Sequence, residues 1–119
     1  MIKVNPNDNV ITITIGEHIY EILKFLRAGE GYISGPVMLE RAKNMNAHLG
    51  VKEALYIVEH QRDIPVDLRG KIFLVFIDCR HPSNPDFVAY LCWTFGAWNL
   101  YWVRLGCNWN GADRLARRK

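Results

Sequence analysis

Three consecutive segments of the chain, residues 71–80, 86–95 and 98–105, carry apolar side chains at both odd and even positions. Side chains alternate between the two faces of a strand, so strands of this kind form a sheet that is apolar on both faces. A loop with two prolines, residues 81–85, separates the first two segments, and a glycine-containing turn separates the last two. The pattern therefore predicts a three-stranded antiparallel meander that needs cover on both faces.

The turn between the last two segments sets the register of the meander. Gly96 and Ala97 suit the central positions of a type II′ turn, which asks for glycine first. This turn places Phe95 opposite Trp98 and, further along, Ala89 opposite Arg104. One face then carries Phe87, Leu91, Trp93, Phe95, Trp98, Leu100 and Trp102, and the other carries Val88, Tyr90, Cys92, Tyr101 and Val103.

The amino-terminal part of the chain changes its periodicity twice. Residues 11–15 alternate between apolar and polar, as in a half-buried strand. Residues 5–8 form a dense turn cluster between residues 1–4 and 9–15. These features predict an amino-terminal hairpin. Residues 17–28 then show helical spacing and end at a glycine-rich loop, which predicts a helix whose apolar side comprises Ile19, Ile22, Leu23 and Leu26.

Two further helices are expected in the middle of the chain. Ser34 and Pro36 are typical of a helix start, and this helix should run over residues 35–48. The next should cover residues 51–61 and end before Pro65. We therefore predict an α+β fold with an N-terminal β-hairpin, three helices and a C-terminal three-stranded antiparallel meander packed on the helices.

Composition places the chain in the ordinary globular class. Of its 119 residues, 50% are hydrophobic and 23% are charged. No uninterrupted apolar stretch reaches the length of a membrane helix, and the amino terminus has no secretory-signal pattern. Three cysteines are an odd number for a disulfide framework, which favours a cytoplasmic protein. Small size without catalytic motifs would also suit a phage or mobile-element accessory protein.

The formal charge of +3 is unevenly distributed along the chain. Four of the fifteen basic residues lie at the carboxyl end, so residues 1–113 carry 11 basic against 12 acidic side chains. This distribution predicts a single domain over residues 1–113 followed by a solvated basic tail, residues 114–119. Nucleic-acid binding is the alternative function, and in the tail it would use Arg114, Arg117, Arg118 and Lys119.

The helical pair over residues 35–61 offers a second route to nucleic acid. Its turn resembles a helix-turn-helix motif in Met45, Leu49, Gly50 and Val51. The second helix, however, carries more acidic than basic side chains, whereas phosphate neutralisation dominates DNA affinity. An ordinary helical hairpin lying on the sheet is the simpler interpretation.

Cys79 and His81 are the weak candidates for catalysis, as a nucleophile and its base. No oxyanion motif accompanies them, and a buried cysteine usually serves as a small apolar residue. Together with Cys92 and Cys107 they have the ligand types of a zinc site, but the expected register disperses them along the sheet. The sequence shows no cofactor-binding motif.

All four tryptophans lie within 17 residues, between Trp93 and Trp109. Tryptophan, tyrosine and arginine are the residues that most often anchor protein interfaces. We therefore expect a protein-interaction module, a homodimer or a binder of another protein, whose helices cover the Tyr90/Tyr101 face and leave the tryptophan face open. The expected partner-binding residues are Trp93, Trp98, Trp102, Arg104 and Arg80.

Overall fold

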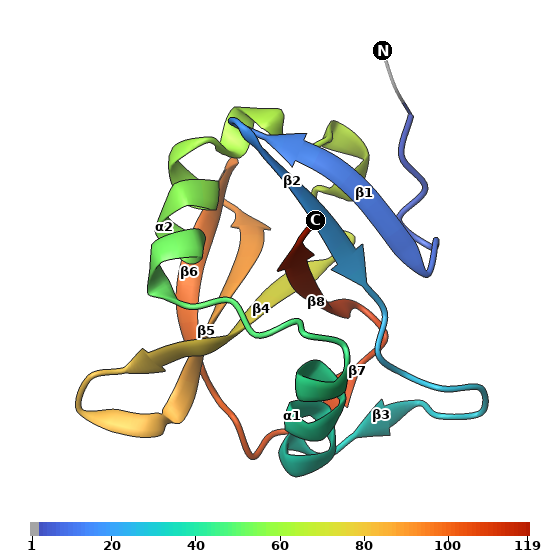
Figure 1. Cartoon of the computed structure of the whole chain (residues 1–119), viewed down its shortest axis with the longest axis vertical. Coiled ribbons are helices and arrows are strands. Elements are labelled where there is room, and N and C mark those ends of the chain that lie inside the picture. The colour runs from blue at the N-terminus through green and yellow to red at the C-terminus, as the bar shows by residue number, and fades with distance from the viewer. Residues whose placement is uncertain (1–2) are drawn as a thin grey trace.

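The computed structural model describes residues 3–119, and its main feature is a curled six-stranded sheet (Figure 1). The strand order is β1-β2-β8-β4-β5-β6, and every neighbouring pair is antiparallel except β4–β8. The strands are β1 (Val10–Ile15), β2 (His18–Leu23), β4 (Phe73–His81), β5 (Asn84–Thr94), β6 (Ala97–Arg104) and β8 (Asp113–Arg118). A separate two-stranded sheet pairs β3 (Tyr32–Ile33) with β7 (Trp109–Asn110). The sequence prediction of a simple three-stranded meander is therefore wrong: β4, β5 and β6 do follow one another, but three more strands extend their sheet.

The segment predicted as the first helix forms β2, which pairs with β1 in a hairpin. Gly16 has a φ of 61° in the two-residue turn between them, a conformation that glycine adopts at little cost. The helical spacing misleads because it counts Ile19, whose side chain is 45% exposed, whereas Tyr20 is fully buried. The predicted partner of β1, residues 1–4, is not a strand at Lys3 and Val4, and residues 1–2 lie outside the described part of the chain.

The predicted basic tail is a central strand of the sheet. Residues 113–118 form β8, which lies between β2 and β4. Leu115 and Ala116 are buried there, and Arg114 is only 3% exposed. The prediction failed because residues 113–118 show no period-two alternation, two apolar residues being flanked by two charged ones on each side, and because the paired strands β2 and β4 are distant in sequence.

Two α-helices are present in the described residues, α1 (Gly35–Asn44) and α2 (Val51–Glu59), where the sequence predicts three. The Ser34 side chain accepts a hydrogen bond from the Val37 amide, which confirms the predicted start of α1. Two short 3-10 turns follow α2, η1 (Gln61–Asp63) and η2 (Val66–Leu68). Neither α-helix has the length and apolarity that a membrane crossing needs.

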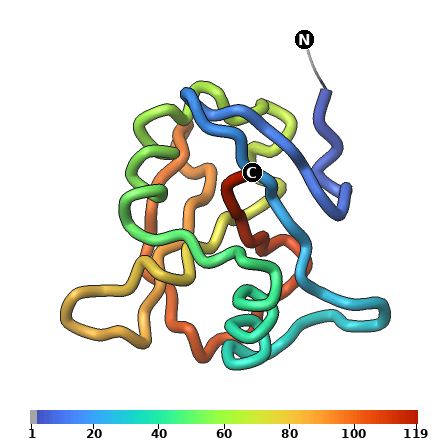
Figure 2. Tube along the Cα trace, in the orientation of Figure 1, coloured from blue at the N-terminus to red at the C-terminus, as the bar shows by residue number. Residues whose placement is uncertain are grey.

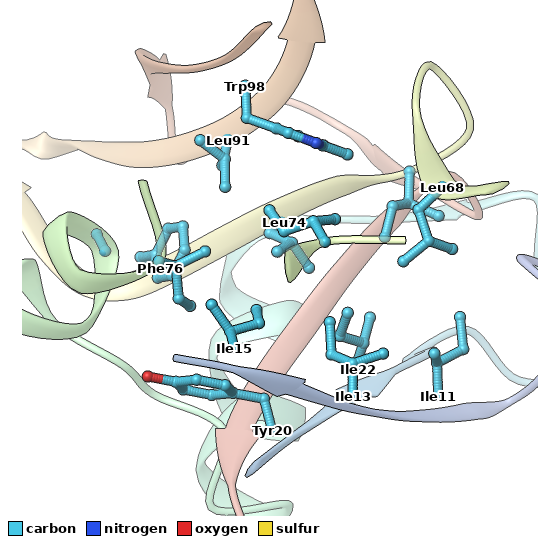
Figure 3. Close-up of a cluster of buried hydrophobic side chains, with 14 of the residues drawn as sticks. Ile11, Ile13, Ile15, Tyr20, Ile22, Leu68, Leu74, Phe76, Leu91 and Trp98 are labelled. Carbon is cyan, nitrogen blue, oxygen red and sulfur yellow. The ribbon is translucent and has the colours of Figure 1, made fainter. Parts of the chain in front are cut away.

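Apolar clusters cover both faces of the sheet. The inner cluster lies within the curl, where β1 and β2 face β4 and β5, and α2 contributes Ala54 and Ile57 (Figure 3). The outer cluster lies against the other face and includes Met38 and Ala42 of α1 together with Trp109 of β7. The chain thus supplies cover for both apolar faces, whereas the sequence suggests that it covers only one.

The segment from α2 to η1 connects the two ends of the curled sheet. At the β6 edge, the Gln61 side chain accepts a hydrogen bond from the Trp98 amide at 2.9 Å and donates one to the Trp98 carbonyl at 3.2 Å. At the β1–β2 turn, the Tyr56 hydroxyl accepts from the Glu17 amide at 2.8 Å, and Asp63 accepts from the Gly16 amide at 2.8 Å. The trace in Figure 2 shows this segment running from beside β6 toward that turn.

Deletion of residues 114–119 should abolish cooperative folding. The deletion removes most of β8, so β2 and β4 lose their common neighbour and the core loses Leu115 and Ala116. Far-UV circular dichroism during heating measures the effect, and deletion of Lys119 alone serves as the control. A cooperative melt that survives the longer deletion would contradict the central position of β8.

Candidate interaction site at the β5–β6 hairpin

The turn between β5 and β6 consists of Phe95 and Gly96, one position earlier than the sequence predicts. Thr94 pairs with Ala97 and Trp93 pairs with Trp98. The strands are thus shifted by two residues relative to the predicted register. Because side chains alternate with period two, this shift keeps every strand residue on its predicted face, but Phe95 moves from the strand into the turn.

Phe95 is 98% exposed at the tip of this hairpin. Its φ is 53° and that of Gly96 is 79°, the pair of positive values that a type I′ turn requires. Such turns favour asparagine or aspartate at the first position, since most other side chains crowd the backbone there. Phenylalanine is therefore unfavourable at this position for two reasons: its backbone has a positive φ, and its apolar ring is exposed to water.

A polar network holds the tip on one side of the hairpin. The Asn99 side-chain amide donates to the Thr94 carbonyl at 3.0 Å and to the Thr94 hydroxyl at 3.1 Å. The Thr94 and Tyr101 hydroxyls lie 2.7 Å apart in a further hydrogen bond. These contacts fix the backbone just before Phe95, so the ring is presented from an ordered support.

Aromatic and cationic side chains pack on the opposite side of the hairpin from this polar network. The Arg69 guanidinium lies over the Trp93 ring, 4.2 Å from its centroid, and the rings of Trp93 and Trp98 meet edge to face at 6.0 Å. Trp98 is itself held by the two Gln61 hydrogen bonds. We call Phe95, Trp93, Arg69 and Tyr101 the hairpin-tip site.

The structure separates the five predicted partner-binding residues. Trp98 is 1% exposed and packs in the inner cluster with α2, so the tryptophan face is the one that α2 covers, which corrects the prediction that this face is open. Trp93 is half-buried beneath Arg69, whereas Trp102 is 45% exposed. Four residues of strand separate Trp98 from Trp102, a distance of about 13 Å.

The remaining two predicted residues lie toward the opposite end of the hairpin. The Trp102 ring contacts His81 edge to face at 4.9 Å, and the exposed Arg104 lies over Phe87 at 5.3 Å. Arg80 is half-buried and donates to the carbonyls of Ile77 and Pro85 at 2.6 and 2.9 Å. Arg80 thus supports the β4–β5 connection, and of the predicted partner-binding residues at this end Trp102 and Arg104 are the exposed ones.

Cys79 and His81 do not form a nucleophile–base pair. The Cys79 thiol is buried, which raises its pKa and lowers its reactivity. His81 accepts a hydrogen bond from the Ser83 amide at 3.0 Å and turns its ring toward Trp102. In residues 3–119 no three histidine, cysteine or acidic side chains gather closely enough to hold a metal ion.

The four basic residues considered for nucleic acid are largely engaged within the fold. Arg117 donates to Glu21 at 2.9 Å and to the Met45 carbonyl at 2.7 Å, and Arg118 approaches Glu53 at 3.4 Å. Arg114 is buried, and the backbone amide of Lys119 bonds to the Ile19 carbonyl. Only Arg118 and Lys119 among them are exposed.

A polar cluster that the sequence does not reveal lies between β2 and α2. The His18 and Tyr56 rings stack at 4.2 Å, and the Tyr20 hydroxyl donates to Glu53 beside a cavity of about 260 Å³. Burial, reinforced by the hydrogen bond to Glu53, raises the pKa of Tyr20, so this phenol stays protonated and acts as a donor. The cluster connects β2 to α2. Helical spacing hid it because that pattern placed His18 on a helix.

Comparison of the chain with protein-family models, with curated proteins and with solved structures gives no match.

Replacement of Phe95 by asparagine should stabilise the protein by about 1 kcal/mol, because asparagine tolerates positive φ and completes the favoured Asn-Gly turn. Phe95→Ala is the matched control: it removes the ring but retains the backbone penalty, so it should bring little gain. Chemical denaturation measures both variants. A loss of stability in Phe95→Asn would show that the ring contributes to the fold.

Proposed function

We propose that the protein is a protein-interaction module that inserts Phe95 into an apolar pocket on another protein. The observation that supports this proposal is a fully exposed phenylalanine in a left-handed turn conformation. Backbone strain of this kind is retained where a function depends on it. An exposed ring that contributes no packing to its own fold gains about 2 to 3 kcal/mol when a partner buries it.

The surroundings of Phe95 have the composition of an interface anchor. Trp93, Arg69 and Tyr101 flank the tip, and these residue types dominate the binding energy of known interfaces. The Asn99 network fixes the turn before binding, so little conformational freedom remains to be lost. Trp102 and Arg104 lie further along the hairpin, where a large partner would reach them.

Binding of a different protein is favoured over a homodimer. A twofold dimer uses the same patch on both chains, so two protruding tips would have to meet each other rather than enter a pocket. A protruding side chain is instead complementary to a concave surface. The three free cysteines support a reducing, cytoplasmic location for this encounter.

A photo-crosslinking residue at position 95 should capture one protein in the cells that encode this chain. The purified pair should then bind with an affinity that Phe95→Asn weakens roughly 30-fold or more, the effect of losing an anchor of about 2 kcal/mol. Leu55→Asn is the matched control, because Leu55 is an exposed apolar residue of α2 and not of the β5–β6 hairpin.

Light scattering at several concentrations completes this test. A dimer that Phe95→Asn dissociates would identify the partner as a second copy of the chain. A monomer whose crosslinks at position 95 are no more specific than those at position 55 would overturn the proposal.

A further inference from the structure

Arg114 of β8 is a buried cation with unused hydrogen-bond donors. The residue is 3% exposed, and its Nη2 donates to the Pro6 carbonyl at 2.9 Å. Its Nε and Nη1 have no hydrogen-bond partner among the described residues. Nε carries one N–H group and Nη1 carries two, so most of the donors of this guanidinium are unsatisfied.

No carboxylate in the described residues forms an ion pair with Arg114. Asp113 is adjacent in sequence, but neighbouring residues of a strand point to opposite faces, and its carboxylate accepts instead from the Asn110 amide at 2.9 Å. A buried charge is normally paired, since removing it from water is costly. Among the described residues, Arg114 therefore has no carboxylate within ion-pair distance, and the charge of the neighbouring Asp113 acts on it without direct contact.

A cavity of about 410 Å³ lies beside this residue. The cavity is bounded by the amino-terminal turn on one side and the β7–β8 turn on the other, and its lining is Pro6, Asn7, Lys71, Gly111, Ala112 and Arg114. Two of these side chains are cationic and none is acidic. Arg114 and its acceptor Pro6 both line the cavity, whereas the Nε and Nη1 atoms of Arg114 lie behind its wall.

We propose that this cavity binds the phosphate group of a small molecule between Arg114 and Lys71. The phosphate oxygens take the place of the Pro6 carbonyl at Nη2 and accept from Nε on the same edge of the guanidinium, while the exposed Lys71 ammonium closes over the group from the outside. Nε is closed to solvent in this structure, so the amino-terminal turn that carries Pro6 shifts as the ligand enters. The cavity is larger than a phosphate ion, which favours a phosphate monoester over the free ion.

Titration of the full chain with inorganic phosphate and with glycerol phosphate, at constant ionic strength set by chloride, tests the site. We expect saturable one-site binding by calorimetry and a rise in melting temperature. Tighter binding of glycerol phosphate identifies a monoester as the ligand, and equal binding identifies free phosphate. Absence of saturable binding for both probes would overturn the proposal.

Lys71→Met should weaken binding about tenfold, the loss of one charge-assisted contact, without affecting the fold. Lys43→Met, on the exposed side of α1, is the matched control and should bind like the unmodified chain. Equal affinities for the two variants would contradict the assignment.

Arg114→Met provides a second readout. It should abolish phosphate binding, and phosphate should no longer raise its melting temperature. Binding that survives in this variant would overturn the role of Arg114. If the variant fails to fold, the comparison of Lys71→Met with Lys43→Met decides.

Discussion

The connection of the two sheet edges by the α2–η1 segment is the constraint on which the rest of the structure depends. A curled open sheet has two edge strands, here β1 and β6, whose backbone groups need partners or cover. Gln61 pairs with the backbone of β6, and Tyr56 and Asp63 pair with the turn that follows β1. Ala54 and Ile57 of this segment are buried in the inner cluster, so the segment covers that cluster between the two edges. The hairpin-tip site depends on it too, since Trp98 is held from the same residue, Gln61.

The chain covers its own sheet, so a partner is not needed to bury an apolar sheet face. Both apolar faces of the sheet have cover, the inner one from α2 and the outer one from α1 and β7. An exposed sheet face is therefore no argument for a partner. The argument rests on a single position, Phe95, where the chain accepts an unfavourable backbone and a hydrated ring in an otherwise well-supported turn.

The sequence predicted the elements whose local signals agree with their environment. The three strands after residue 71 follow from their apolar runs, and the start of α1 follows from Ser34 and Pro36. The strands β5 and β6 also keep their predicted faces. The segment 17–28 was predicted wrongly because its apolar residues fit two periods, and pairing with β1 and β8 decides between them. No local sequence pattern predicts the charged strand β8, because its position depends on pairing with β2 and β4, which are distant in sequence.

The candidate sites were less predictable for the same reason. The sequence predicts a partner-binding surface at the tryptophans, and Trp93 does lie beside the hairpin tip. The position of Phe95 could not be predicted, because it depends on a two-residue difference in register that moves Phe95 from the strand into the turn. The burial of Arg114 and its cavity depend on contacts with Pro6, 108 residues away. No pattern within one segment contains that information.

Native-state hydrogen exchange in Gln61→Ala tests the closure of the sheet most directly. The Gln61 side chain reaches the β6 edge through its two hydrogen bonds to Trp98. We nevertheless expect faster exchange in both β6 and β1, because the α2–η1 segment loses its attachment and the gap opens at both edges. Faster exchange confined to β6, with β1 amides unchanged, would show that the two edges are independent and would contradict the account.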